Sequence, residues 1–340
     1  MNIIFTICSN NYLAQAKILI ASASEFSPES ILVIGLVDER SSQIDYDNFL
    51  PAVIVPIAEL KLENDLELYA KYNIVELNTC VKASYFKYLS HRFPQVKKII
   101  YFDPDIKIFN SLESMLLELD KAEIILTPHI LTAIKPDEFK PQENIFLNYG
   151  LYNLGFLGLR AHTQNVNTFL DWWEERILHN GFANVAQGFF VDQLPVNFVP
   201  IFFKHVSILK AFGYNMAPWN LHERRLAQQA EGSLLLNDGS PLYFYHFSTY
   251  DYKKPGQLCK DYYTRFNFQK RPDLVKIYAD YNKELFNNGV DRYEKVPCAI
   301  LKSTAVQTVV SASDNTLKSF VKQFLPPIFH SLKNRFLKHG

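Results

Sequence analysis

Residues 96–105 read VKKIIYFDPD, an apolar run that stops at two carboxylates on either side of a proline. The run from Val96 to Phe102 predicts a buried strand, and the Asp-Pro-Asp that follows predicts a turn at its carboxyl end. Asp103 and Asp105 are spaced i, i+2, so at a strand end their side chains point to the same side. Such a pair can hold a divalent cation through hard oxygen ligands, but it is also ordinary turn chemistry, and both interpretations stay open.

The same pattern of a strand followed by a polar break recurs over the first 130 residues. Strands are expected at 2–8, 31–36, 53–57 and 124–127, and helices at 12–24, 59–71 and 78–91. This alternation predicts an α/β fold with a mostly parallel sheet flanked by helices. The polar stretches Ser9-Asn10-Asn11, Val37-Asp38-Glu39 and Asp103-Pro104-Asp105 then lie on one rim, where such sheets bind ligands.

The second half of the chain is organised differently, with a helix that contains Trp172 and Trp173, a strand at 241–247 and a helix at 272–287. We therefore expect an α/β domain at 1–265, made of two halves at 1–130 and 131–265, and a helical region at 266–340. Its last part, 302–340, carries six basic side chains against one acid, with apolar residues at helical spacing. This basic amphipathic tail either contacts an anionic membrane or docks on the protein's own core.

The composition excludes several classes of protein. Lys and Arg number 35 and Asp and Glu 35, and a net charge of zero argues against a nucleic-acid partner. The four cysteines form no Cys-x-x-Cys pair, which argues against a zinc ribbon and a disulfide scaffold. Neither a signal peptide nor an apolar stretch long enough to span a bilayer is evident, so we expect a cytoplasmic protein with reduced thiols.

Three further groups could carry chemistry. His246 could complete a metal shell as a neutral imidazole, although a half-buried core histidine at a strand end is the commoner explanation. Asp192 and Gln193, followed by Asn197, suit the recognition of sugar hydroxyls, but they could equally form a capped turn. Gly155 could let the backbone approach a ligand closely.

In their order along the chain, these motifs resemble the retaining nucleotide-sugar glycosyltransferases of the GT-A fold, close to glycosyltransferase family 8. The resemblance covers roughly residues 2–260 and is strongest in YFDPD at 101–105, which is similar to the family's Asp-x-Asp element. The other matching segments are Ser9-Asn10-Asn11-Tyr12, Asn153-Leu154-Gly155, Asp192-Gln193-x-x-x-Asn197 and His246-Phe247 with a downstream Lys-Pro. ELNTCVKASYFKYL, TPHI and YNMAPWNLHER also resemble a bacterial branch of surface-polysaccharide transferases.

The resemblance implies metal-dependent transfer of a hexose or N-acetylhexosamine from a UDP-sugar to a glycan or lipid-linked acceptor, with retention of configuration. It also implies that 1–130 is the nucleotide-binding half of the domain and 131–265 the sugar- and acceptor-binding half. Asp103, Asp105 and His246 would bind Mn²⁺ or Mg²⁺, which bridges the donor diphosphate. Ser9, Asn10 and Tyr12 would contact the nucleoside, and Lys82 or Lys87 would neutralise the donor phosphate. Asn153, Asp192 and Gln193 would contact the transferred sugar. Lys254 would close over the diphosphate. Asp192 and Gln193 are the nearest candidates for a nucleophile, whereas a front-face mechanism needs none.

The chain also departs from the family pattern. The family usually carries Arg where this helix has Lys82 or Lys87, and it has a glycine between the histidine and the lysine of the last segment, where 247–253 contains none. Pro255 is followed by Gly256, where the family often has Trp.

Three alternatives stay open. A sugar nucleotidyltransferase would need a glycine-rich, basic loop after the first strand. Here that loop is Cys8-Ser9-Asn10-Asn11, which contains no glycine and no basic residue. A non-catalytic binding protein would be expected to have lost Asp103, Asp105 or His246, and all are present. An inverting mechanism needs a general base placed for the acceptor, which the sequence does not decide.

Overall fold

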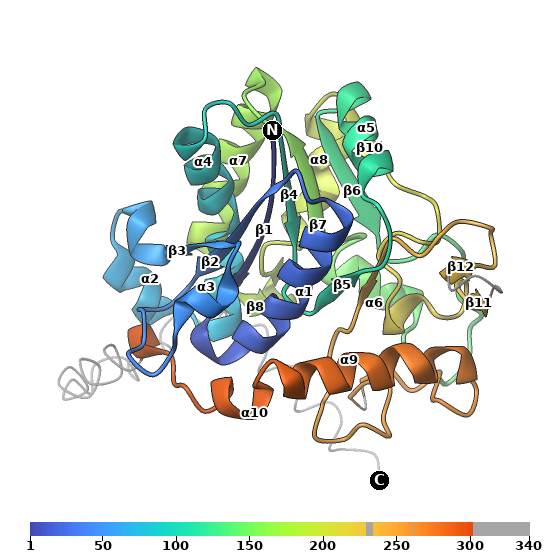
Figure 1. Ribbon diagram of the computed structural model, residues 1–340. Helices are drawn as coiled ribbons and strands as arrows, with labels where there is room; N and C mark the ends of the chain where they lie inside the picture. The colour runs from blue at the N-terminus through green and yellow to red at the C-terminus, as the bar shows by residue number, and fades with distance from the viewer. Residues whose placement is uncertain (229–233, 261, 302–340) are drawn as a thin grey trace, which may run out of the picture.

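The computed structural model describes residues 1–228, 234–260 and 262–301 and is built around one seven-stranded sheet (Figure 1). The strand order is β10-β6-β7-β4-β1-β2-β3. The strands are β1 (Asn2–Cys8), β2 (Ile31–Leu36), β3 (Val53–Pro56), β4 (Lys98–Phe102), β6 (Ile124–Pro128), β7 (Tyr152–Arg160) and β10 (Val206–Ile208). Neighbours pair in parallel except at β7, which runs antiparallel to both β4 and β6. The predicted mostly parallel sheet is confirmed.

Helices cover both faces of this sheet, so its strands are apolar on both sides. In β1, Ile3 and Phe5 belong to one core cluster, whereas Ile4 belongs to the other. The helices are α1 (Leu13–Phe26), α2 (Asp65–Lys71), α3 (Ile74–Cys80), α4 (Lys82–Arg92), α5 (Glu113–Lys121), α6 (Glu143–Tyr149), α7 (Gln164–Asn180), α8 (Val199–Phe202), α9 (Val275–Asn287) and α10 (Val290–Tyr293). Helices α1, α5 and α9 pack in the cluster of Ile4, and α3, α4 and α7 pack in that of Phe5.

Three short antiparallel pairs lie outside the central sheet. They are β5 (Ile106–Ile108) with β13 (Phe244–His246), β8 (Ala183–Asn184) with β9 (Phe189–Phe190), and β11 (Leu226–Gln228) with β12 (Leu234–Leu236). The first pair directly continues the turn after β4, and it carries a predicted site residue at its end. The strand expected at 241–247 is therefore present but shorter.

The structure differs from the sequence-based elements in several places. The helix expected at 59–71 is shorter, because only Asp65–Lys71 forms α2, after a 3-10 turn at Ile57–Leu60. The helix expected at 78–91 begins at Ile74 and is divided at Val81 into α3 and α4. Strand β7, which the sequence analysis did not assign, contains two glycines. One of them, Gly158, lets β7 lie against Ile125, because a Cβ there would come within 2.5 Å of the Ile125 Cγ1 atom. Glycine serves close packing here, not a break in the strand.

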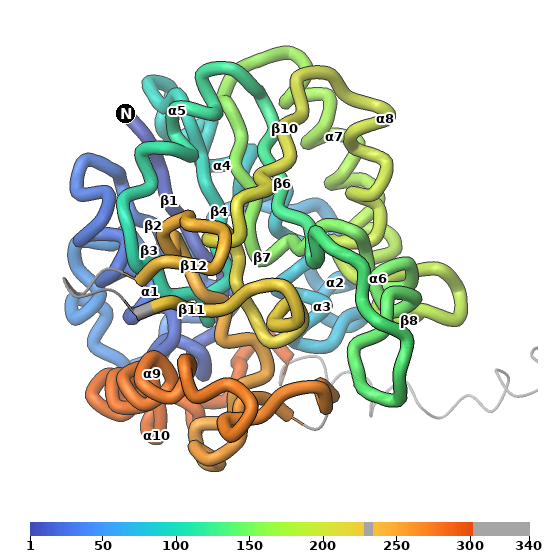
Figure 2. The backbone as a smooth tube through the Cα atoms, turned by 90° about the vertical axis from the view of Figure 1, so that its right-hand side faces the viewer, coloured from blue at the N-terminus to red at the C-terminus, as the bar shows by residue number. Residues whose placement is uncertain are grey.

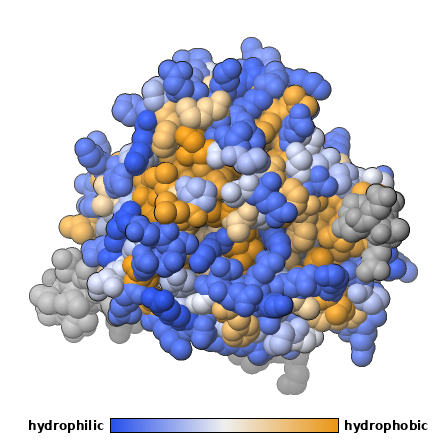
Figure 3. Space-filling view, in the orientation of Figure 1, coloured by the Kyte–Doolittle hydropathy of each residue, from blue (hydrophilic) through white to orange (hydrophobic). Residues whose placement is uncertain are grey.

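Helices α9 and α10 lie along one end of the molecule, next to α1 (Figure 1). Tyr281 of α9 stacks on Phe247 with ring centroids 3.8 Å apart, and the hydroxyls of Tyr278 and Tyr245 are 3.0 Å apart. The outer surface of α9 is mostly hydrophilic (Figure 3). The described part of the predicted 266–340 region thus shares a core with the region before it, whereas the predicted tail at 302–340 lies outside the described residues. No helix within the described ranges is both long and apolar enough to cross a bilayer.

Replacing Tyr281 by alanine should destabilise the whole domain, because it removes a buried ring from the core shared by α9 and β13. We expect a loss of about 3–5 kcal/mol in the free energy of unfolding, measured by denaturant titration, within one cooperative transition. The exposed Val275 of the same helix is the control, and Val275→Ala should change stability by less than about 0.5 kcal/mol. A separate early transition in the Tyr281→Ala variant would instead show that the C-terminal helices unfold independently.

Candidate active site

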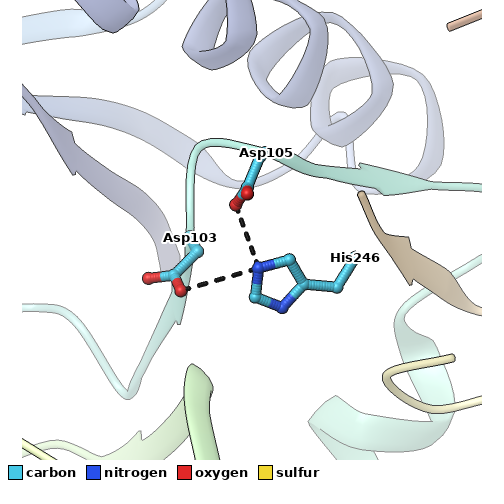
Figure 4. Close-up of side chains that lie close together, drawn as sticks. All are labelled: Asp103, Asp105 and His246. Carbon is cyan, nitrogen blue, oxygen red and sulfur yellow. Dashed lines mark ion pairs between the residues drawn. The ribbon is translucent and has the colours of Figure 1, made fainter. Parts of the chain in front are cut away.

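Two carboxylates and one imidazole converge at the carboxyl end of β4 (Figure 4). The turn after β4 presents Asp103 and Asp105, and β5 then pairs with β13 so that His246 stands opposite Ile106. The His246 Nε2 atom is 3.0 Å from an Asp105 oxygen and 3.8 Å from an Asp103 oxygen. One ligand atom from each side chain lies within 4.8 Å of the other two. The structure thus brings together the three predicted metal ligands.

The environment of His246 fits a metal ligand. Burial alone would lower the pKa of its imidazole, but Asp105 and Asp103 act in the opposite direction and leave that pKa raised. The ring lies against Gly155, where a Cβ would come within 2.6 Å of the His246 Cε1 atom, and meets Trp219 edge to face. The group that approaches Gly155 is therefore this imidazole. Two carboxylates and one nitrogen form a donor set that suits Mn²⁺ and that Mg²⁺ can also use.

Lys82, the first residue of α4, supplies a buried positive charge beside this cluster. Its Nζ atom is 2.5 Å from an Asp192 oxygen and 3.7 Å from an Asp103 oxygen, and it donates a hydrogen bond to the Leu154 carbonyl at 2.8 Å. The Tyr101 hydroxyl donates to Asp103 at 2.6 Å. Burial raises the pKa of Asp192, and the Lys82 ammonium opposes that shift. The resemblance implied that Lys82 would neutralise the donor phosphate. In the structure, its ammonium contacts other groups of the protein instead.

The structure does not bring Lys87 into the cluster. Five residues after Lys82, it lies about 140° further around a helix of 3.6 residues per turn. Its ammonium pairs with Asp171 at 2.9 Å and Glu174 at 2.5 Å, both on α7. Lys254 is exposed in the loop after β13.

The predicted nucleoside contacts fall into two groups. Ser9 and Asn10 are buried, and their side chains donate to the carbonyls of Val37 and Glu39 at 3.0 and 2.8 Å. They tie the ends of β1 and β2 together. Tyr12 is 37% exposed and lines a cavity of about 290 Å³. The other residues lining this cavity are Ile7, Cys8, Ser9, Asn11, Ile74, Val75, Asn78, Thr79, Tyr101, Asp103, Pro104 and Asp105.

The predicted sugar contacts, Asn153 and Gln193, belong to a buried hydrogen-bonded network next to the Lys82–Asp192 pair. The Gln193 Oε1 atom accepts from the Leu154 amide at 3.0 Å, and its Nε2 atom donates to the Tyr149 carbonyl at 2.7 Å. The Asn153 Oδ1 atom accepts from the Gly155 amide at 3.1 Å. These bonds fix the start of β7 against the segment that carries Asp192.

Asn215 and His129 complete this network and were not predicted as site residues. The Asn215 side chain donates to the Asn153 Oδ1 and Thr127 Oγ1 atoms, at 2.9 Å each. The His129 Nε2 atom is 3.2 Å from the Asn153 amide nitrogen, and burial lowers the pKa of His129 to about 3, so its ring stays neutral. The sequence could have pointed to His129, because it directly follows β6, which the sequence predicted as a strand. It could not have pointed to Asn215, which a distant loop brings to the site.

A comparison with protein families agrees with this geometry. The sequence model of glycosyl transferase family 8 matches residues 3–195, more than half of the chain. The chain belongs to this family. It is a glycosyltransferase of the GT-A fold, and the resemblance seen in its motifs is confirmed.

Relatives of this family 8 protein are known as sequences and as structures. Two are the uncharacterized proteins YfnF and YfnD of Bacillus subtilis (strain 168), each 25% identical. The matches cover 82% of this chain and 90% of YfnF, and 81% of this chain and 86% of YfnD. The galactosyltransferase LgtC, solved with donor and acceptor sugar analogs, is 14% identical with a TM-score of 0.48, covering 89% of this chain and all of LgtC. Mouse xyloside xylosyltransferase 1 is 14% identical with a TM-score of 0.44. The match covers 72% of this chain and 97% of the xylosyltransferase chain.

Replacing Lys82 by methionine should destabilise the protein, because it leaves the buried Asp192 carboxylate without its counter-charge. We expect a loss of about 3–5 kcal/mol in the free energy of unfolding, measured by denaturant titration. Adding Asp192→Asn should recover part of that loss, since the buried charge is then gone. Lys87→Met, on the same helix but partly exposed, is the control and should cost less than about 1 kcal/mol. Equal losses in the two lysine variants would contradict this account of Lys82.

Proposed function

We propose that this family 8 enzyme transfers a hexose or N-acetylhexosamine from a UDP-sugar and needs a divalent metal ion to do so. The observation that carries the proposal is the convergence of Asp103, Asp105 and His246 beside the cavity that Tyr12 lines. A donor nucleotide needs a planar surface for its base and a positive centre for its diphosphate. In this chain both would be met within one cavity at the end of β4.

Each protein group has a distinct role in this proposal. Asp103, Asp105 and His246 would hold Mn²⁺ or Mg²⁺, and a bound ion would supply Lewis-acid stabilisation of the leaving diphosphate. Tyr12 packs against the base, while Ser9 and Asn10 hold the rim beneath it. Lys82 pairs with Asp192 and holds it in place, and Asn153 and Gln193 fix the backbone around the transferred sugar. Lys254, exposed after β13, closes over the diphosphate.

We propose retention of configuration without a protein nucleophile. Asp192 is the nearest carboxylate, but it is buried and pairs with Lys82. Both polar atoms of the Gln193 side chain already hydrogen-bond to the backbone. Gln193 therefore has no free polar atom for the sugar, and the Asp192 carboxylate is already held by the Lys82 ammonium. Departure of the diphosphate on the face that the acceptor attacks, with a phosphate oxygen taking the acceptor proton, requires neither.

We propose a glycan or lipid-linked acceptor used in surface polysaccharide synthesis, with the reaction in the cytoplasm or at the inner face of the membrane. The support is the resemblance of several segments to transferases of that kind, including YNMAPWNLHER at 214–224. Peripheral membrane contact through 302–340 stays a prediction, because those residues are outside the described ranges.

Isothermal titration of UDP, with and without Mn²⁺, tests the donor and metal assignments together. Wild-type protein should bind UDP with an affinity that rises with Mn²⁺. Asp105→Ala and Asp103→Ala should each lose at least about 100-fold of the metal-dependent affinity while remaining folded, because a direct ligand is lost. Asp280→Ala, on the exposed surface of α9, is the control and should bind like wild type.

Tyr12→Ala should weaken UDP binding by about tenfold or more, both with and without metal, since stacking on the base is lost. Metal-independent binding that survives in Asp105→Ala would overturn the metal assignment.

The stereochemical outcome can be measured with water as the acceptor. Hydrolysis of the UDP-sugar, followed by proton NMR before the released sugar mutarotates, should show the anomer that the donor carried. In a front-face mechanism, the acceptor attacks the anomeric carbon from the same face of the sugar that the diphosphate leaves, so the configuration is kept. The opposite anomer would replace retention by inversion and would leave the donor and metal assignments unaffected.

A further inference from the structure

Three large apolar side chains stand out of the surface at and just before α8. Phe198 is 50% exposed, Ile201 is 75% exposed and Phe202 is 56% exposed. The rings of Phe198 and Phe202 stack with centroids 5.1 Å apart, so the two form one apolar tip. Single exposed apolar residues are normal on a soluble protein, but three within five positions are a contiguous patch of the kind that marks an interaction site.

The patch continues toward the amino-terminal end of β7. The Asn197 side chain accepts a hydrogen bond from the amide of the exposed Leu151, at 2.8 Å. Tyr149 contacts the ring of Phe190 at 4.5 Å and that of the exposed Tyr262 at 6.3 Å. Elements α8, α6 and β8 follow one another from top to bottom along one side of the molecule (Figure 2). We call this surface the Phe198 ridge; its exposed members are Leu147, Leu151, Phe198, Ile201, Phe202 and Tyr262.

The charges of this region favour an anionic partner. Between residues 182 and 210 the sequence contains one acidic residue, Asp192, and that side chain is buried against Lys82. Lys204 and Lys210, in the same segment, are exposed. On the adjoining α7, Asp171 and Glu175 pair with Lys87 and Arg176.

We propose that the Phe198 ridge docks on an anionic lipid bilayer. The Phe198, Ile201 and Phe202 side chains would enter the boundary between headgroups and acyl chains, while Lys204 and Lys210 meet lipid phosphates. A second copy of the chain fits this surface less well, because two ridges face to face would bring their lysines together. None of the ridge residues belongs to the 302–340 segment.

Docking in this way would place the site next to a membrane-borne acceptor, a consequence that rests on the proposed function. The ridge reaches Tyr149, whose carbonyl is bonded to Gln193, and Gln193 directly follows Asp192. A sugar carried on a lipid could therefore reach the site from the bilayer without being extracted into water.

Co-sedimentation of the full chain with phosphatidylglycerol–phosphatidylcholine vesicles tests the proposal. Ile201→Ser combined with Phe202→Ser should lower the partition coefficient by about tenfold or more, because two large apolar side chains no longer enter the bilayer. Leu66→Ser combined with Leu117→Ser is the matched control, since these leucines are 58% and 54% exposed on α2 and α5, away from the ridge. The control should bind like wild type. Pure phosphatidylcholine vesicles should bind the wild type more weakly.

A fluorescence measurement reports whether the ridge itself enters the lipid. Trp172 packs against Phe202 with ring centroids 5.8 Å apart and is partly exposed, whereas Trp173 and Trp219 are buried. Lipids brominated near the headgroup should quench Trp172, and the quenching should disappear in Trp172→Phe. Asp105→Ala should bind vesicles normally, so failure of the donor assignment is distinguishable from failure of this one.

Three results would overturn the proposal. The first is equal vesicle binding by wild type and the Ile201→Ser/Phe202→Ser variant. The second is loss of binding in Lys318→Glu/Lys322→Glu with full binding in the ridge variant, which would assign the contact to the tail. The third is a wild-type dimer, by analytical ultracentrifugation, that the ridge substitutions dissociate, which would make the ridge a contact between copies of the chain.

Discussion

The site depends on one buried charge, the ammonium of Lys82. Asp192 and Asp103 approach it from different strands and loops, and without it two carboxylates would lie near each other with little water to screen them. Removing charges from water is costly, and the cost is offset only where partners and hydrogen bonds are complete. The Leu154 carbonyl provides one such bond. Lys82 thus joins the start of α4, the end of β4 and the loop that carries Asp192 into one unit.

The sheet places the remaining groups around this unit. The reversal at β7 is decisive, because an antiparallel strand between β4 and β6 brings its first residues to the rim where parallel neighbours end. Asn153 and Gly155 lie there for that reason. The short β5–β13 pair then delivers His246 from far along the chain to the same rim. Gly155 is needed twice, since its backbone bonds to Asp103 and its missing side chain leaves room for the imidazole.

Local signals predicted the parts of the fold and site that depend on local chemistry. The strand that ends in YFDPD, the rim at Ser9-Asn10-Asn11 and the position of His246 at a strand end follow from short patterns, and the structure shows each of them. Lys82 and Lys87 could not be separated in this way. They differ only in which side of α4 they occupy, and that depends on the packing of α7, which lies about 80 residues later. Asn215 was missed for a similar reason, since its partner Asn153 is on another element.

The site and the ridge share one stretch of backbone, which couples their positions. Asp192 and Gln193 are held by Lys82 and by the Leu154 amide, and the chain then passes directly through Asn197 to Phe198. The turn from 194 to 198 is a single 3-10 helix, so there is little slack between the buried and exposed ends. The proposed membrane contact thus lies within a few residues of the segment that carries Asp192 and Gln193. In this arrangement a membrane would orient the enzyme and would also bear on the segment that positions Asp192, so acceptor supply and the geometry of the site would be set by the same contact.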